Sequence, residues 1–294
     1  MLENRRNLKW WVTTQVWLIK LWQIRRVLVL VIPYIALLVW LFSAGGVSDA
    51  RPSEVFLVPT EPLWEKPNED HWYGTTGAGA DLFELSRMAM ANSVAIAFLA
   101  SGIGVSLSLL FVMLSAYEPG RNRFRLLRAG RNTIRLVPSM LMVILLCAGA
   151  EGNQIIVILS LAGAVVVSLA PTVALWFEEG ESGDDVFAGY ALGLTRPAII
   201  ANRVVPVVIR RLVGAFAKYV PALILAEMGL SFLGLSGDRI SVGAMVFAGR
   251  DLLIEAPWMA VYPGITATAV VMMFGILGIL VEKALSLDLR TELI

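Results

Sequence analysis

The sequence predicts an all-α integral membrane protein with about six transmembrane helices. Of its 294 residues, 57% are hydrophobic and only 16% are charged, and the mean hydropathy of +0.74 is well above that of a water-soluble domain. Several uncharged runs also reach the ~20 residues that a helix needs to cross a bilayer. These observations exclude a soluble enzyme and a disordered chain. The net charge of +1 gives no electrostatic footprint for nucleic-acid binding, so we expect no nucleic-acid partner.

Three of the expected spans lie in runs without any charged residue: residues 27–48, 88–117 and 256–281. Residues 136–177 are interrupted by one charge, Glu151, in a turn-like Gly-Ala-Glu-Gly-Asn stretch, so this run predicts two helices joined by a tight hairpin. The sixth expected span covers residues 212–237, which contain Lys218 and Glu227.

The chain is expected to divide into four segments. Residues 1–26 mix Trp with Arg and Lys, which predicts an amphipathic segment in the cytoplasmic membrane interface. The next segment, 27–48, is too long and too far from the N-terminus for a signal peptide, so we expect a retained first transmembrane helix. Residues 49–87 form an extracytoplasmic loop in which acidic residues outnumber basic ones, and its length suits a docking role. Residues 88–294 form the membrane core, with a cytoplasmic loop at 178–213.

Basic residues predict the orientation of the chain. Most of its 24 Lys and Arg residues fall in four segments: 1–26, 118–135, 178–218 and 283–294. With six spans, all four lie on the same side as both termini, and the positive-inside rule places that side in the cytoplasm.

Catalytic and metal-binding groups are scarce. His71 and Cys147 are each the single residue of their type, too few for a zinc or iron site, so we expect no metal, no cofactor and no catalytic residue on this chain. The Gly-Leu-Ser-Gly sequence at 234–237 fits an intramembrane serine protease, but His71 is poorly placed to activate the serine, which favours a glycine-rich turn. No Gly-Lys pair of a P-loop occurs, and the few ionisable groups within the spans argue against a gradient-driven carrier.

The cytoplasmic loop predicts a short helix at 182–193. Ser182 followed by Asp185 resembles a capping box, and Gly193 can end the helix before Pro197. Small side chains on this helix would let a groove of another protein approach the backbone. A surface helix without a partner is the alternative. The residues expected to contact the partner are Asp185, Phe187, Ala188, Gly189, Ala191 and Gly193.

Glu227 stands out because a carboxylate at the bilayer centre costs about 2.5 to 3.5 kcal/mol. It lies more than ~10 Å of helix rise beyond Lys218, well inside its predicted span. We therefore expect Glu227 to face a translocation path or a polar partner, with Ser231 and Phe232 on the same path. A buried hydrogen bond that fixes helix packing is the alternative.

The cytoplasmic loop resembles the coupling loop of ABC importer permeases, in which Glu-Ala-Ala is followed by Gly and then by an apolar residue with Leu-Pro. The matching positions here are 187–189, Gly193 and 204–206. Phe187 stands where the family has its glutamate and Gly189 where it has its second alanine, so a hydrophobic docking contact would replace a charged one.

Other stretches resemble the C-type subunit of dipeptide, oligopeptide and nickel permeases. Residues 71–81 resemble the segment before the second span in that subfamily, although no arginine precedes Asp81, and residues 227–264 and 286–288 resemble its C-terminal third. The resemblance implies the type I ABC importer permease fold and a non-catalytic pore subunit of the inner membrane, which carries a peptide or a similar small solute. The implied partners are a second homologous permease subunit, one or two cytoplasmic ATPase subunits that bind ATP and Mg, an extracytoplasmic binding protein and membrane lipid. A membrane scaffold or regulatory subunit with a degenerate coupling loop is the alternative function.

Overall fold

The computed structural model describes residues 32, 35–43, 64–117, 139–149, 152–237 and 239–291. Within these ranges every regular element is a helix, apart from one isolated β-bridge between Thr75 and Asp81. The predicted all-α class is therefore confirmed. The chain forms two compact units, Met1–Trp40 and Leu41–Ile294. In the first unit only residues 32 and 35–40 are described, all of them helical, and the features below belong to the second unit.

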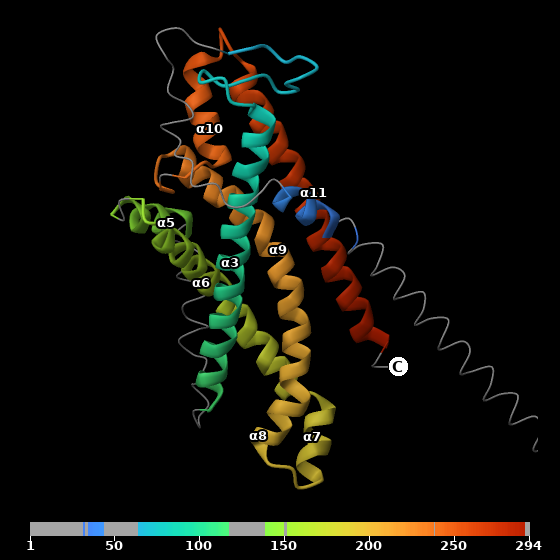
Figure 1. Ribbon diagram of the computed structural model, residues 1–294. Coiled ribbons are helices and arrows are strands. Elements are labelled where there is room, and N and C mark those ends of the chain that lie inside the picture. The colour runs from blue at the N-terminus through green and yellow to red at the C-terminus, as the bar shows by residue number, and fades with distance from the viewer. Residues whose placement is uncertain are drawn as a thin grey trace, which may run out of the picture. The chain divides into compact units, whose positions relative to one another are not determined.

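The second unit is built from long helices joined by short ones (Figure 1). Its elements are α3 (Leu82–Tyr117), α5 (Ser139–Ala148), α6 (Gln154–Glu181), α7 (Asp184–Ala191), α8 (Arg196–Ile199), a π-helix (Ile200–Val204), α9 (Val205–Phe232), α10 (Val242–Gly249), a 3-10 turn (Arg250–Leu252) and α11 (Trp258–Thr291).

Three of the described helices are long and apolar enough to cross a membrane: Leu82–Ser115, Gln154–Glu181 and Trp258–Leu285. They confirm three of the six expected spans and a multi-pass membrane protein. The apolar helix α5 has only 10 residues, and α9 has 28 residues, so the spans predicted there stay predictions. The interfacial segment 1–26 and most of the span 27–48 lie outside the described residues.

Helix α9 is the centre of the second unit, because it contacts α3, α6, α10 and α11. Phe216 of α9 meets Phe98 of α3 edge to face at 5.6 Å, and Phe98 meets Phe274 of α11 at 5.8 Å. Glycines permit the closest approaches, since a Cβ atom at Gly278 would lie 2.7 Å from the carbonyl oxygen of Ala217. Such small residues are typical of membrane helix contacts.

The two helices predicted within residues 136–177 are confirmed: α5 ends at Ala148, α6 begins at Gln154, and they pack against each other. Asn153 caps α6, because its side-chain oxygen accepts a 3.0 Å hydrogen bond from the N–H of Ile155. Glu151, predicted in the turn between them, lies outside the described residues.

Helix α3 begins at Leu82, earlier than the uncharged run that starts at residue 88. Its first turns contain Glu84 and Arg87, which form a 2.7 Å ion pair, and Arg87 also donates to the hydroxyl of Ser43. The helix thus begins several residues before the uncharged run, because a search for uncharged runs finds only the apolar part of a helix. The extracytoplasmic loop at 49–87 stays a prediction.

Candidate functional site

Helix α7 is the helix expected in the cytoplasmic loop, but the predicted capping box is wrong. α7 begins at Asp184, with Gly183 as its N-cap. Ser182 instead ends α6, where both its N–H and its hydroxyl donate to the carbonyl oxygen of Glu179 at 3.2 and 2.9 Å. The prediction failed because α6 continues through the acidic run that we had assigned to the loop, and so reaches Ser182 first.

The C-terminus of α7 is closed by a Schellman motif, which confirms Gly193 as its terminator. Gly193 has φ +78°, a conformation that glycine adopts without strain. Its N–H donates to the carbonyl oxygen of Tyr190 at 3.0 Å, and the N–H of Leu194 donates to the carbonyl oxygen of Gly189 at 3.1 Å.

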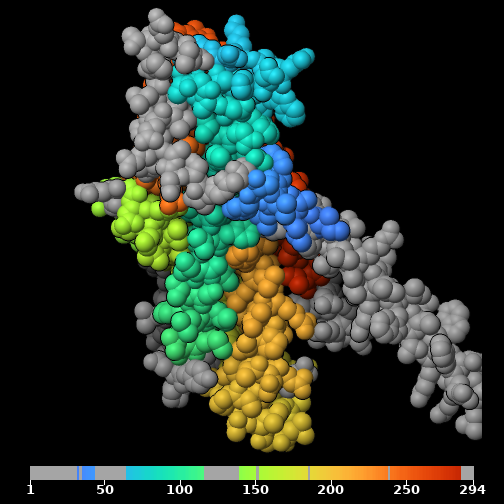
Figure 2. Space-filling view, viewed as in Figure 1, coloured from blue at the N-terminus to red at the C-terminus, as the bar shows by residue number. Residues whose placement is uncertain are grey.

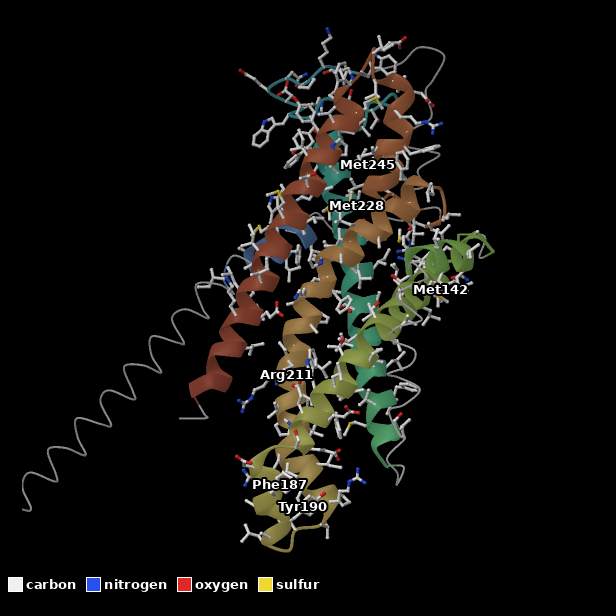
Figure 3. All side chains as sticks on the ribbon, turned by 180° about the vertical axis from the view of Figure 1, so that it is seen from behind. Met142, Phe187, Tyr190, Arg211, Met228 and Met245 are labelled. Carbon is white, nitrogen blue, oxygen red and sulfur yellow. The ribbon has the colours of Figure 1, made fainter. Side chains whose placement is uncertain are left out.

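One face of α7 packs against the protein and the other is apolar and exposed. On the inner face Val186 is only 3% exposed, and a Cβ atom at Gly189 would lie 3.2 Å from Cγ1 of Ile199. The outer face forms what we call the α7 surface, which consists of Phe187, Tyr190, Leu192 and Leu194, exposed by 65%, 48%, 81% and 46%. Figure 3 shows Phe187 and Tyr190 near the tip of this end of the molecule. Clustered exposed apolar side chains of this kind mark an interaction site.

The structure separates the residues that we predicted to contact a partner. Ala188, Ala191 and Gly193 are exposed like Phe187, whereas Gly189 is buried on the inner face. Asp185 lies in the first turn of α7, and its side chain lies outside the description.

Our sequence analysis missed Tyr190, Leu192 and Leu194 because it weighed small residues above apolar ones. The spacing of Phe187 and Tyr190 is the signal that would have found Tyr190, since positions three apart share one side of a helix. Leu192 and Leu194 lie beyond the end of α7, so helical spacing does not report on them.

The α7 end is attached to both long helices beside it. The guanidinium of Arg196 at the start of α8 pairs with the carboxylate of Glu181 at the end of α6, at 3.2 Å. Val204 of the π-helix packs so closely on α6 that a Cβ atom at Gly180 would lie 2.8 Å from its Cγ1 atom. The segment that follows α7 is therefore held against α6 and continues directly into α9.

Glu227 does not face an open path in this structure. Its side chain is 1% exposed, and its Oε1 atom accepts hydrogen bonds from the hydroxyls of Ser231 at 2.6 Å and Ser236 at 2.9 Å. Its Oε2 atom has no hydrogen-bond partner among the described residues. The arrangement is the one that the packing alternative predicts, and the place of Glu227, Ser231 and Phe232 on a translocation path stays a prediction. Phe232 is 38% exposed and meets Phe247 edge to face at 5.6 Å.

Helix α10 explains why Glu227 is covered, and the sequence analysis did not predict it. Ser241 caps α10 through a 3.2 Å hydrogen bond from the N–H of Ala244. α10 folds back against α9 so closely that a Cβ atom at Gly243 would lie 2.1 Å from the carbonyl oxygen of Met228. Only glycine permits this contact, so the packing of α10 on α9 depends on Gly243.

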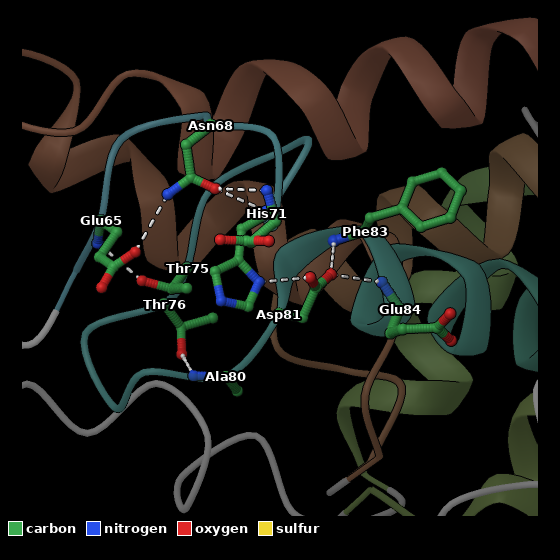
Figure 4. Close-up of polar contacts among 10 residues, drawn as sticks. Glu65, Asn68, His71, Thr75, Thr76, Ala80, Asp81, Phe83 and Glu84 are labelled. Atoms are coloured by element: carbon green, nitrogen blue, oxygen red, sulfur yellow. Dashed lines mark hydrogen bonds and ion pairs between the residues drawn. The ribbon is translucent and has the colours of Figure 1, made fainter.

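At the opposite end of the second unit, residues 64–81 form a compact loop that we call the outer knot (Figure 2, cyan). Its polar groups bind one another (Figure 4). Thr75 accepts from the N–H of Glu65 at 2.7 Å, and the side chain of Asn68 accepts from the N–H of His71 at 2.6 Å. Asp81 accepts from His71 Nδ1 at 2.7 Å and also caps α3, where it accepts from the N–H groups of Phe83 and Glu84 at 2.8 and 3.1 Å.

The His71–Asp81 pair changes the protonation of both groups. The hydrogen bond to Asp81 raises the pKa of His71 above its usual 6.5, against a smaller opposing effect of burial. Burial alone would raise the pKa of Asp81, but the hydrogen bonds from His71, Glu84 and Phe83 outweigh it and lower that pKa below 3.8. The pair therefore widens the pH range over which both groups are charged, at the alkaline end through His71 and at the acid end through Asp81.

Aromatic contacts join the outer knot to α11. Tyr73 stacks on Tyr262 of α11, with ring centroids 4.8 Å apart, and the hydroxyl of Thr266 donates to the Tyr73 hydroxyl at 3.0 Å. Gly74, with φ +76°, lies where a Cβ atom would be 2.5 Å from the carbonyl oxygen of Glu65. Trp72 is left 69% exposed beside these contacts.

Comparison with known proteins identifies the relatives of this chain. No family model matches it. The oligopeptide transport system permease protein OppC of Bacillus subtilis is 25% identical over 226 residues, which cover 76% of this chain and 74% of that protein. The OppC protein of Mycobacterium tuberculosis strain H37Rv is 27% identical over 232 residues, covering 78% and 79%. The dipeptide transport system permease protein DppC of Bacillus subtilis is 27% identical over 229 residues, covering 76% and 71%.

The chain is related to the OppC and DppC permeases. This relationship confirms the resemblance that the sequence motifs predicted. Among solved structures, the crystal structure of an amino acid ABC transporter with histidines matches 71% of this chain and 94% of its own, with a TM-score of 0.49 and 19% identity.

Proposed function

We propose that this chain is the transmembrane pore subunit of an ATP-driven importer and carries a peptide or a similar small solute into the cytoplasm. The observation that carries the proposal is the α7 surface, an exposed apolar patch on a short helix attached to two long ones. The relationship to OppC and DppC permeases supports it. The fold in this proposal is the type I importer permease fold, and the chain itself hydrolyses no ATP.

In this proposal the α7 surface binds a cytoplasmic ATPase subunit. Helix α7 then acts as a lever, because the Arg196–Glu181 pair and the contact of Val204 with Gly180 connect it to α6 and α9. The ATP and Mg belong to that partner. A second homologous permease completes the pore, with Glu227, Ser231 and Phe232 as residues that shape the path from inside the chain rather than line an open surface.

The outer knot is proposed to receive an extracytoplasmic binding protein. Its exposed Glu65, Glu69 and Asp70 belong to the same short loop as the exposed Trp72, and an aromatic anchor among polar residues suits a docking contact. In this proposal the chain lies in the inner membrane with the α7 end in the cytoplasm. A cysteine at Glu69 should crosslink to the binding protein, and a failure with an active crosslinker would remove this part of the proposal.

The sharpest test compares Phe187→Glu with Trp72→Glu. The two side chains have nearly equal exposure, 65% and 69%, at opposite ends of the unit. Loss of an apolar anchor should weaken ATPase association about thirtyfold or more for Phe187→Glu, while Trp72→Glu leaves it unchanged. The measurement is co-purification of ATPase subunits and substrate-stimulated ATP hydrolysis. Equal ATPase association in both variants would overturn the proposed coupling role.

A further inference from the structure

A cavity of about 730 Å³ lies between α6, α9 and α11 and belongs to no function described so far. Its volume is within the range of small-ligand sites. The residues that line it lie toward the α7 end of each helix: Trp176 on α6, Arg210 and Arg211 on α9, and Glu282 on α11. By the positive-inside rule this is the cytoplasmic side of the membrane, and Trp is typical of the interface.

The cavity is basic at one end. Arg210, Arg211 and Lys218 line it, against one lining carboxylate, Glu282. The guanidinium of Arg211 lies 5.8 Å from the ring centroid of Trp176. Its side chain remains 32% exposed although it pairs with a carboxylate outside the lining. The ammonium of Lys218, 62% exposed, reaches both oxygens of Glu282 at 3.2 and 3.3 Å. Three cations thus face two carboxylates, Glu282 in the lining and Glu179 beside it, so an anion would meet a small excess of positive charge.

The lining loses its charged groups with distance from the α7 end. Along α9 it passes from Arg210 through Lys218 to Ala222 over ~18 Å of helix rise. On α6, which runs the other way, Leu169 lies ~10 Å farther from the α7 end than Trp176. A ligand that matches this gradient has an anionic head at the cytoplasmic interface and a hydrocarbon tail toward the bilayer centre.

We propose that this cavity binds the phosphate group of an anionic phospholipid from the cytoplasmic leaflet. Basic pockets between transmembrane helices on the cytoplasmic side suit such head groups. Arg210 and Arg211 hold the phosphate, Lys218 supports it from deeper in the cavity, and the acyl chain lies along Leu169 and Ala222. A peptide in transit would also find cations here, but the side chains of Leu169 and Ala222 suit an acyl chain better than a polar backbone, for which the deeper lining offers only the hydroxyls of Thr172 and Tyr219.

The test measures lipid retention by the full chain, purified in detergent with whatever subunits accompany it. The probes are phosphatidylglycerol and phosphatidylcholine with the same acyl chains, quantified by native mass spectrometry. We expect preferential retention of phosphatidylglycerol. Arg210→Gln with Arg211→Gln should reduce that retention about tenfold or more, and Lys218→Gln about fivefold. The matched control is Arg203→Gln, an exposed arginine near the cavity that does not line it, and it should change nothing.

Glu282→Gln is a second test, which still applies if the arginine or lysine variants misfold. It removes the carboxylate that competes for Lys218, so phosphatidylglycerol retention should rise about fivefold. Equal retention of the two lipids, or equal loss in Arg203→Gln and the cavity variants, would overturn the proposal. Displacement by soluble glycerol 3-phosphate alone would assign the site to free phosphate compounds, and displacement by a short acidic peptide would assign it to the transport path. Neither probe requires ATP or a partner, so a negative result leaves the proposed transport function intact.

Discussion

The outer knot and the α7 surface differ in where their side chains find partners. In the outer knot the side-chain oxygens of Thr75, Asn68 and Asp81 accept hydrogen bonds from within the loop, and Tyr73 stacks on α11. At the other end, α7 is closed by backbone bonds at Gly193 and leaves its largest apolar side chains outside. A loop whose polar groups bind one another is rigid, whereas an exposed apolar face is typical of a surface that binds a partner. The comparison therefore predicts that the outer knot keeps its shape without a partner, whereas the α7 surface is covered only when a partner binds.

The largest expected effect comes from two glycines with nearly the same backbone conformation. Gly74 has φ +76° and Gly193 has φ +78°. An added Cβ atom at Gly74 would lie 2.5 Å from a backbone oxygen, whereas at Gly193 it would meet nothing within 4 Å. Gly74→Ala should thus destabilise the protein by about 3 kcal/mol or more, through strain and overpacking together, and Gly193→Ala by only about 1 to 2 kcal/mol.

Thermal unfolding in detergent measures this difference, with limited proteolysis to locate the loosened end. Equal losses of stability in the two variants would contradict a rigid outer knot, because they would show that its backbone can move as freely as the end of α7.

The next effect concerns Glu227, which lies between the two ends. Glu227→Leu removes the acceptor of the Ser231 and Ser236 hydroxyls, which should cost about 1 to 3 kcal/mol of stability, whereas Glu227→Gln keeps an acceptor oxygen and should cost less than about 1 kcal/mol. Assembly and transport are measured separately for both variants. Impaired transport with normal assembly of Glu227→Gln would support a role of the charge in transport, and full transport would remove that role.

The long helices could be predicted from the sequence because apolar runs such as 256–281 report directly on length and hydropathy. The small elements could not. α10 has only eight residues, and what defines it is the contact of Gly243 with the backbone of α9, a tertiary feature without a local pattern. Glu227 was found by its charge, but its orientation depends on that same contact.

Local sequence patterns also failed to predict helix ends where one residue fits two patterns. Ser182 can cap a helix that follows it or end one that precedes it, and the continuation of α6 decided between the two. His71 and Asp81 were noticed within a family motif, yet their pairing requires the turn that includes Gly74, whose positive φ the sequence does not reveal.

A smaller effect is expected from pH, and only in the outer knot. The raised pKa of His71 means that its contribution to stability is full below pH 6.5 and is lost as the pH rises through the higher folded value. The lowered pKa of Asp81 means that its contribution is full above pH 3.8 and is lost as the pH falls through the lower folded value. The outer knot should therefore be most protected from hydrogen exchange between about pH 4 and 6.5.

Amide exchange of residues 64–81, corrected for intrinsic rates, measures this window, and α7 serves as the internal reference. His71→Gln should abolish the loss of protection on the alkaline side. It should reduce the loss on the acid side without abolishing it, because Asp81 keeps its hydrogen bonds from Phe83 and Glu84. If protection is still lost on the alkaline side in His71→Gln, a group other than His71 causes that loss.

The smallest expected effect tests the attachment of α7. The Arg196–Glu181 pair joins side chains that are 36% and 20% exposed, at 3.2 Å, and partly exposed pairs contribute at most about 1 kcal/mol. Arg196→Gln should therefore lower the unfolding free energy by less than about 1 kcal/mol and leave the α7 surface available, so ATPase association should weaken no more than about fivefold. If this pair is part of the lever, ATP hydrolysis should become less dependent on substrate while binding persists. A loss of ATPase association as large as that of Phe187→Glu would instead show that the pair holds α7 in its folded position, and the contrast between a self-supporting outer knot and a loosely held α7 would become sharper.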